Sequence, residues 1–304
     1  MTLRAFVPGI YPRSEALVQA TRDLDRGRTT PESVEAQVQE DFDSFVRLQE
    51  EAGLDLFSDG MLTWQDLFRP LVEASAGLTA RPLVRFLDTN TFYRAVLVDA
   101  EPRLHRPLRA PELPSGRWLA TLPSPYSFSR AAQREVSAEA LAANVLAPQI
   151  EAYAEAGCAL VVLWEPFLTR EASGLPALLA ALAELPRPLP LALQLPFGDA
   201  GPLLPELAEV ELGGIGVDFY ATSADAVPEG LETTLLAGVA DARTSALEDA
   251  TELATFAERL RDRVAGEVVL VPNGDLQFVS ESIAREKVLS LGRARTASSK
   301  EAVA

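Results

Sequence analysis

The chain has 304 residues, of which 48% are hydrophobic, and a formal net charge of −17. The length suits one large core such as a (β/α)₈ barrel of about 250 residues with an insertion, and the negative charge argues against nucleic acid or an anionic membrane as a partner. No apolar stretch approaches the roughly 20 residues of a membrane helix, and no signal peptide is recognisable. The single cysteine excludes an internal disulfide. We therefore expect a cytoplasmic protein.

The first third of the chain predicts two strands, one long helix and an insertion. Residues 3–7 read as a strand, and Thr30-Pro31-Glu32 reads as the start of a helix that ends at Gly53. Residues 54–57 read as the second strand. Residues 61–116 break the strand–helix rhythm, and we interpret them as an insertion over the barrel mouth that can contain a hairpin.

The rest of the chain alternates apolar runs with helical stretches. After a strand at 118–121 and a helix from Ser137 to Ala156, five apolar runs each end at a polar residue, namely Glu165, Gln194, Asp218, Asp241 and Asn273. Such runs are typical of buried parallel strands. The pattern predicts an α/β fold, a (β/α)₈ TIM barrel forming one domain over residues 1–295, with 296–304 as a flexible tail.

Polar residues at the carboxyl ends of barrel strands meet at the mouth, where such enzymes keep their chemistry. Several carboxylates in one cavity repel each other, which raises at least one pKa and suits acid/base work or amine binding. Equally, some of them could cap helices or bond loop amides. Arg13 and Arg94 follow aromatic residues and could hold an anionic group, or lie on the surface.

Scarce residue types restrict the chemistry further. His105 and Cys158 are the single histidine and cysteine, and the two lysines are Lys287, within a charged helical stretch, and Lys300, near the end. A thiolate or imidazole zinc site needs several such ligands, and a Schiff base needs a desolvated lysine in the mouth. Neither chemistry is expected.

Several segments, in order along the chain, resemble the catalytic barrel of cobalamin-independent methionine synthase. They are residues 9–14, 53–60, 88–94, 123–127 and 164–166. The resemblance implies a (β/α)₈ barrel and transfer of a methyl group from a methylated folate to the thiol of homocysteine, which zinc activates.

The sequence departs from that family where the chemistry lies. The positions of the zinc ligands correspond to Gln194, Pro196, Asp218 and Gly274, and the amino-acid site has Ile10, Met61 and Trp164 in place of polar residues. Loss of each buried polar partner costs on the order of 1 to 3 kcal/mol. We therefore expect the zinc and homocysteine sites not to be retained.

We interpret the chain as a diverged, zinc-free transferase of methyl or related groups that acts on a small molecule other than homocysteine. Glu165 and Asp218 are the expected catalytic residues. No metal or required cofactor is expected, although methylated folate is a candidate donor, and the oligomeric state is open. The expected substrate-binding residues are Arg13, Met61, Asp66, Tyr93, Arg94, Ser127, Trp164, Gln194, Asp241 and Asn273.

Three alternatives remain. The chain could be a non-catalytic barrel that binds a small ligand, or it could keep residual methyltetrahydrofolate–homocysteine methyltransferase activity. A decarboxylase or lyase that uses Asp59 with Arg13 is the third.

Overall fold

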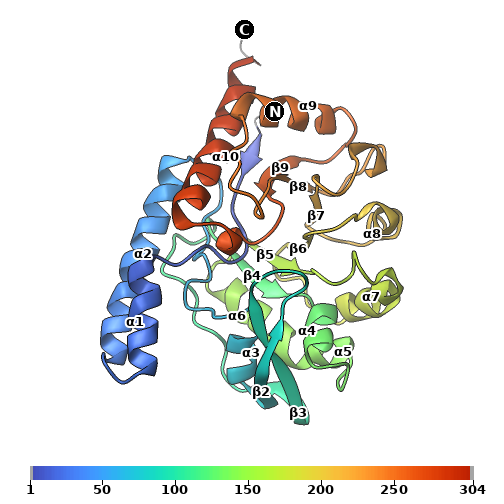
Figure 1. Cartoon of the computed structure of the whole chain (residues 1–304). Helices are drawn as coiled ribbons and strands as arrows, with labels where there is room; N and C mark the ends of the chain where they lie inside the picture. The colour runs from blue at the N-terminus through green and yellow to red at the C-terminus, as the bar shows by residue number, and fades with distance from the viewer. Residues whose placement is uncertain (1–2, 302–304) are drawn as a thin grey trace.

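The computed structural model describes residues 3–301 and contains a curled parallel sheet of seven strands in the order β1-β9-β8-β7-β6-β5-β4. Figure 1 shows this sheet at the centre of the molecule with helices around its outer side. The predicted α/β, TIM-barrel type of fold is confirmed. The strands are β1 (Arg4–Ala5), β4 (Leu119–Pro123), β5 (Leu160–Trp164), β6 (Leu191–Leu195), β7 (Gly214–Asp218), β8 (Leu235–Ala240) and β9 (Val268–Pro272).

The second of the eight predicted strands is not a regular strand. Residues 54–58 lie between the edge strands β1 and β4, but only Phe57 forms a bridge, to Trp118. On the other side, Asp55 N–H donates to Ala5 O at 2.9 Å, and the Asp55 carboxylate accepts the Ala5 N–H at 2.8 Å. Because a side chain takes the place of a backbone acceptor there, the ladder to β1 does not continue.

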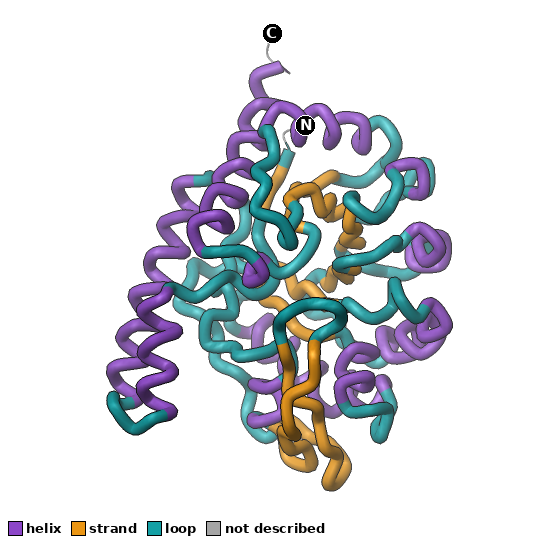
Figure 2. The backbone as a smooth tube through the Cα atoms, viewed as in Figure 1, coloured by secondary structure: helices purple, strands orange, loops and turns teal. Residues whose placement is uncertain are grey.

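The helices lie outside the sheet, and Figure 2 shows them as a partial ring around the strands. The helix predicted from Thr30 is confirmed, because Thr30 caps α2 with its side chain. The stretch predicted from Ser137 to Ala156 is also helical, with a π-helical turn at Ala142–Leu146 between α5 and α6. The helices are α1 (Glu15–Asp25), α2 (Pro31–Glu51), α3 (Arg69–Glu73), α4 (Pro125–Ala131), α5 (Ala138–Leu141), α6 (Ala147–Glu155), α7 (Leu175–Ala183), α8 (Leu204–Leu207), α9 (Ala250–Arg261) and α10 (Glu281–Glu301).

The insertion contains an antiparallel hairpin of β2 (Ser75–Arg85) and β3 (Phe92–Leu104). Its tip contacts the loop that follows β5, because Asp88 forms an ion pair with Arg170 at 2.9 Å and the Phe86 ring packs against Phe167. In Figure 1 the hairpin lies in front of the lower part of the sheet.

At the carboxyl end, helix α10 continues past residue 295 to Glu301, so this part of the expected tail is helical. Residues 302–304 lie outside the described residues. Within residues 3–301, no helix is both long and apolar enough to cross a membrane.

The strands form for the reason that the sequence predicts. Strands β4 to β9 are buried at every position because they pack on the barrel interior on one face and on helices on the other. Their carboxyl ends therefore bring the polar residues that follow them to one side of the sheet.

Candidate functional site

Three residues at the carboxyl ends of the neighbouring strands β7, β8 and β9 are in direct contact. The side-chain amide of Asn273 donates to Asp218 Oδ1 at 2.9 Å and to Asp241 Oδ1 at 3.1 Å, and its carbonyl oxygen accepts the Ala242 N–H at 2.8 Å. Asp218 and Asn273 are fully buried, and Asp241 is 7% exposed. One amide thus holds two carboxylates together, and this group is called the Asp218 cluster.

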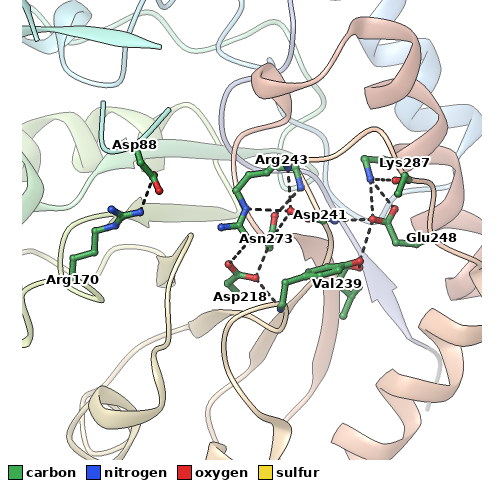
Figure 3. Close-up of polar contacts among 12 residues, drawn as sticks. Asp88, Arg170, Asp218, Val239, Asp241, Arg243, Glu248, Asn273 and Lys287 are labelled. Atoms are coloured by element: carbon green, nitrogen blue, oxygen red, sulfur yellow. Dashed lines mark hydrogen bonds and ion pairs between the residues drawn. The ribbon is translucent and has the colours of Figure 1, made fainter. Parts of the chain in front are cut away.

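Arg243 is the cation of the Asp218 cluster (Figure 3). Its guanidinium lies 3.7 Å from Asp218 Oδ2 and 3.4 Å from Asp241 Oδ1, and its side chain is 41% exposed. Burial raises the pKa of Asp218, an effect that the hydrogen bonds from Asn273 and from Tyr220 N–H and the charge of Arg243 oppose. A carboxylate with a raised pKa is a stronger proton acceptor than one with an ordinary pKa.

Buried polar atoms at this site lack partners. Asp218 Oδ2 has no hydrogen bond, and neither the oxygen nor the nitrogen of the Gln194 amide has one. Gln194 pairs in register with Trp164 on β5 and with Gly216 on β7, so the side-chain positions share one face of the sheet. A Cβ at Gly216 would lie 1.9 Å from Gln194 Oε1, so this glycine leaves room for the amide. Buried polar atoms normally find a partner, and these can receive one from a ligand.

Phe197, on the loop after β6, covers the same region. It has a φ of +61°, which is rare for a residue with a side chain, and such conformations concentrate at functional sites. The guanidinium of Arg243 lies 5.3 Å from the centre of its ring. A Cβ at Gly274 would lie 2.0 Å from the ring, so the absence of a side chain at 274 makes the position of Phe197 possible.

Glu165 belongs to a different set of contacts. Its Oε1 accepts the N–H groups of Phe167 at 3.0 Å and Leu168 at 2.9 Å, and its Oε2 accepts the hydroxyl of Ser124. Burial raises its pKa, and these hydrogen bonds oppose the shift. Both oxygens are engaged in fixing the loops after β4 and β5, so the geometry gives Glu165 a positioning role.

Two other predicted residues, Ser127 and Met61, have separate sets of contacts. Ser127 is fully buried on α4, and its N–H donates to the Ser124 hydroxyl at 3.0 Å. Met61 is buried with a φ of +50°, and its N–H donates to Asp59 Oδ1 at 2.9 Å. Their contacts do not include the Asp218 cluster.

Three predicted residues lie together where the hairpin joins the barrel. Asp66 accepts the N–H groups of Phe68 and Arg69 through Oδ1 and that of Arg94 through Oδ2. The Arg94 guanidinium donates within the hairpin to Arg81 O at 3.3 Å, and Tyr93 packs edge-on against Phe68. These contacts anchor the hairpin to α3.

Arg13 is half-buried, and the largest influence on its pKa is burial, which lowers it, while the charge of Asp41 on α2 opposes the shift. It therefore lies beside α2. The substrate-binding roles of these residues stay predictions.

Sequence reasoning missed Asp275 as well as Phe197 and Arg243. Asp275 is buried, its Oδ1 accepts the Ile10 N–H at 2.8 Å, and burial raises its pKa to about 7. Gly9 lies between Asp275 Oδ1 and the Trp164 ring, and a Cβ at residue 9 would lie 2.6 Å from Asp275 Oδ1. The strand-end rule that selected Asn273 could have found Asp275 two residues later, and likewise Arg243 after Asp241, but nothing in the sequence marks Phe197.

A buried ion pair supports the loop that carries Asp241 and Arg243 (Figure 3). Lys287 Nζ on α10 is 2.8 Å from Glu248 Oε1, and the same oxygen accepts the Asp241 N–H at 2.8 Å and the Tyr220 hydroxyl at 3.1 Å. Lys287 is fully buried. The lysine is therefore desolvated, although its charged stretch of sequence suggested a solvated side chain. Its ammonium group is paired with Glu248.

The residues at the zinc-ligand positions implied by the sequence resemblance do not fit zinc. Gln194 and Pro196 supply no anionic or imidazole ligand, and the Phe197 ring fills the space beside Gly274. The remaining candidate, Asp218, accepts an amide N–H. Among the described residues 3–301, no group of three or more His, Cys, Asp and Glu side chains is placed to hold a metal ion.

Comparison with solved structures supports the fold. The B12-independent methionine synthase of Shewanella sp. W3-18-1, solved in complex with selenomethionine, has a TM-score of 0.80 and 15% sequence identity over 100% of this chain and 99% of that chain. A candidate vitamin-B12-independent methionine synthase of Listeria monocytogenes has a TM-score of 0.72 and 15% identity, over 98% and 99%. At this identity the likeness concerns the fold.

No protein-family model matches the chain, and a search of curated proteins found no match.

Proposed function

We propose that this barrel binds a small molecule at the Asp218 cluster and transfers a methyl or related group to it without zinc, the acceptor being a compound other than homocysteine. The observation that carries the proposal is that two buried groups, Asp218 Oδ2 and the Gln194 amide, make no hydrogen bond, while the Arg243 guanidinium lies 3.7 Å from Asp218 Oδ2.

The acceptor that these groups favour carries an N–H. Asp218 Oδ2 can only accept a hydrogen bond when ionised, whereas the Gln194 amide offers both a donor and an acceptor. Arg243 offsets one of the two carboxylate charges of the Asp218 cluster. An amine or a nitrogen heterocycle with an adjacent carbonyl therefore satisfies more of the buried groups than a thiol does.

Methyl transfer to such a nitrogen balances without a metal. The acceptor nitrogen forms a bond to the methyl carbon, while the bond from that carbon to the nitrogen of a methylated donor such as a folate breaks with its electron pair. Asp218 takes the proton of the acceptor, for which its raised pKa is suited. We propose that Asp275, which follows Asn273 by two residues and has a pKa of about 7, protonates the departing donor.

A non-catalytic ligand-binding barrel is the second candidate, and the geometry of Glu165 favours it. Both oxygens of this expected catalytic residue are occupied by loop amides and Ser124. Under this alternative, the Asp218 cluster binds the same class of compound without turnover.

The test combines metal analysis, thermal shift and transfer of a ¹³C-labelled methyl group from methyltetrahydrofolate to a panel of amines and nitrogen heterocycles. We expect no stoichiometric zinc, no stabilisation by homocysteine, and stabilisation by one nitrogen compound that Asp218→Asn removes and the exposed control Asp225→Asn keeps. Labelled product supports the transferase, whereas stabilisation without product supports the binding barrel. One zinc per chain with stabilisation by homocysteine would overturn the proposal and restore the methionine synthase activity.

A further inference from the structure

A groove of about 420 Å³ lies between helix α2 and the loop that contains residues 109–112. Its volume falls within the range of small-molecule pockets, roughly 300 to 1,000 Å³. None of its lining residues belongs to the Asp218 cluster. The groove is therefore separate from the Asp218 cluster at the barrel mouth.

The wall formed by α2 is apolar and only partly covered. Val34, Val38 and Phe42 line the groove and are half-buried, whereas Phe45 and Leu48 on the continuation of the same stripe are fully packed. The apolar stripe of an amphipathic helix normally packs on the core. Its amino-terminal half is thus left with apolar surface that another molecule can cover.

The groove also contains a carboxylate without a cation. Asp59 lines it, and its Oδ1 accepts the Met61 N–H at 2.9 Å. Within residues 3–301, no Lys, Arg or His forms an ion pair with Asp59. Burial raises the pKa of Asp59, and the hydrogen bonds from the backbone N–H groups of Met61 and of Asp59 itself oppose that shift.

The charges at the rim of the groove also favour a cationic ligand. Glu35 and Glu112 line the groove together with Arg109, so with Asp59 the lining has three carboxylates and one guanidinium. Arg109 and Glu112 are 80% and 79% exposed and paired to each other. An apolar wall with a net negative lining is complementary to an apolar cation.

We propose that this groove is a second binding site, whose ligand is a small amphipathic amine with its alkyl or aryl body on Val38 and Phe42 and its ammonium group on Asp59. This site is independent of the proposed transfer reaction. The ammonium supplies the counter-charge that the chain itself does not provide, and the apolar body covers the exposed half of the α2 stripe.

The probe is hexylamine, titrated into the full-length protein at pH 7 by calorimetry, with 1-hexanol as the uncharged analogue. We expect hexylamine to bind and Asp59→Asn, which keeps an oxygen for the Met61 N–H, to weaken binding at least tenfold. Equal binding of hexanol and hexylamine, unchanged binding to Asp59→Asn, or no binding of hexylamine would each overturn the proposal.

A second pair of variants covers the case in which Asp59→Asn does not fold. Val38→Trp fills the groove from the half-buried face of α2 and is expected to abolish hexylamine binding, whereas Ala36→Trp, on the exposed face, is expected to leave it unchanged. Equal effects of the two substitutions would contradict the proposed location. A wild-type dimer that Val38→Trp dissociates would also overturn it, because a second copy would then be the occupant.

Discussion

Replacing Lys287 by methionine is expected to destabilise the protein strongly, although the residue stands on a charged helical stretch. Lys287 Nζ is 2.8 Å and 3.1 Å from the two oxygens of Glu248 and 2.5 Å from Ala246 O. The side chain of Lys287 is 0% exposed and that of Glu248 is 9% exposed. Methionine fills a similar volume, so the main change is the loss of one charge.

The magnitude follows from what Glu248 retains. Removing one partner of a buried ion pair costs about 3 to 5 kcal/mol, because the other charge stays buried. Glu248 Oε1 still accepts the Tyr220 hydroxyl and the Asp241 N–H, which favours the lower limit. A loss of about 3 kcal/mol lowers the Tm by roughly 6 to 12 °C, at about 2 to 4 °C per kcal/mol for a large domain.

The assay is urea unfolding of Lys287→Met beside Arg285→Met. Arg285 lies on the same helix and pairs with Glu51 at 2.6 Å, but the two side chains are 44% and 55% exposed, so the expected cost is below about 1 kcal/mol. Adding Glu248→Gln to Lys287→Met is expected to recover part of the stability. Equal losses for the two single variants, or no recovery in the double variant, would refute the argument that burial makes this pair important.

Three further predictions concern the mouth. Ionisation of Asp275 disfavours the folded state, because its pKa is about 7 when folded and near 3.8 when unfolded, so the stability of the protein should fall as pH rises from about 4 to 7. Asp275→Asn should reduce this fall when Tm is measured against pH, and an unchanged slope would exclude this carboxyl as the cause. Gly274→Ala places a Cβ 2.0 Å from the Phe197 ring and should lower the free energy of unfolding in urea by about 1 to 3 kcal/mol. The double variant with Phe197→Ala should lose less stability than the two single variants together, and strict additivity would contradict the clash. Glu165→Ala leaves the N–H groups of two loop residues without their acceptor, so it should lower the Tm and speed proteolysis of the loop after β5. A Tm and a protease resistance equal to those of the wild type would argue against the positioning role.

The buried strands could be predicted from sequence because their burial is a local property. A run such as Leu160–Trp164 is short and apolar at every position, as expected for a strand covered on both faces. The exception is informative, since residues 54–57 have a suitable pattern but the Asp55 carboxylate takes the Ala5 N–H. That competition depends on a partner 50 residues away and is invisible in the local pattern.

The sequence predicted which strand-end residues would lie together, but not all of their contacts. The strand-end rule found Asp218, Asp241 and Asn273, which are in contact. It could not show that loop amides occupy Glu165, because the approach of a loop is decided by tertiary packing.

The two-residue strand β1 has a consequence for synthesis of the chain. Arg4 pairs with Val269, 265 positions later, and the loop after β1 is fastened by Asp275. At about 5 to 20 residues per second, the ribosome needs roughly 13 to 53 s to deliver that partner. The edge of β1 that pairs with β9 therefore stays unpaired while β4 to β8 are made, and it is open to chaperones and proteases until residues 268–272 have been synthesised. A nascent chain stalled before residue 268 should thus keep the β9-facing edge of β1 accessible, even when Asp55 already holds the other edge.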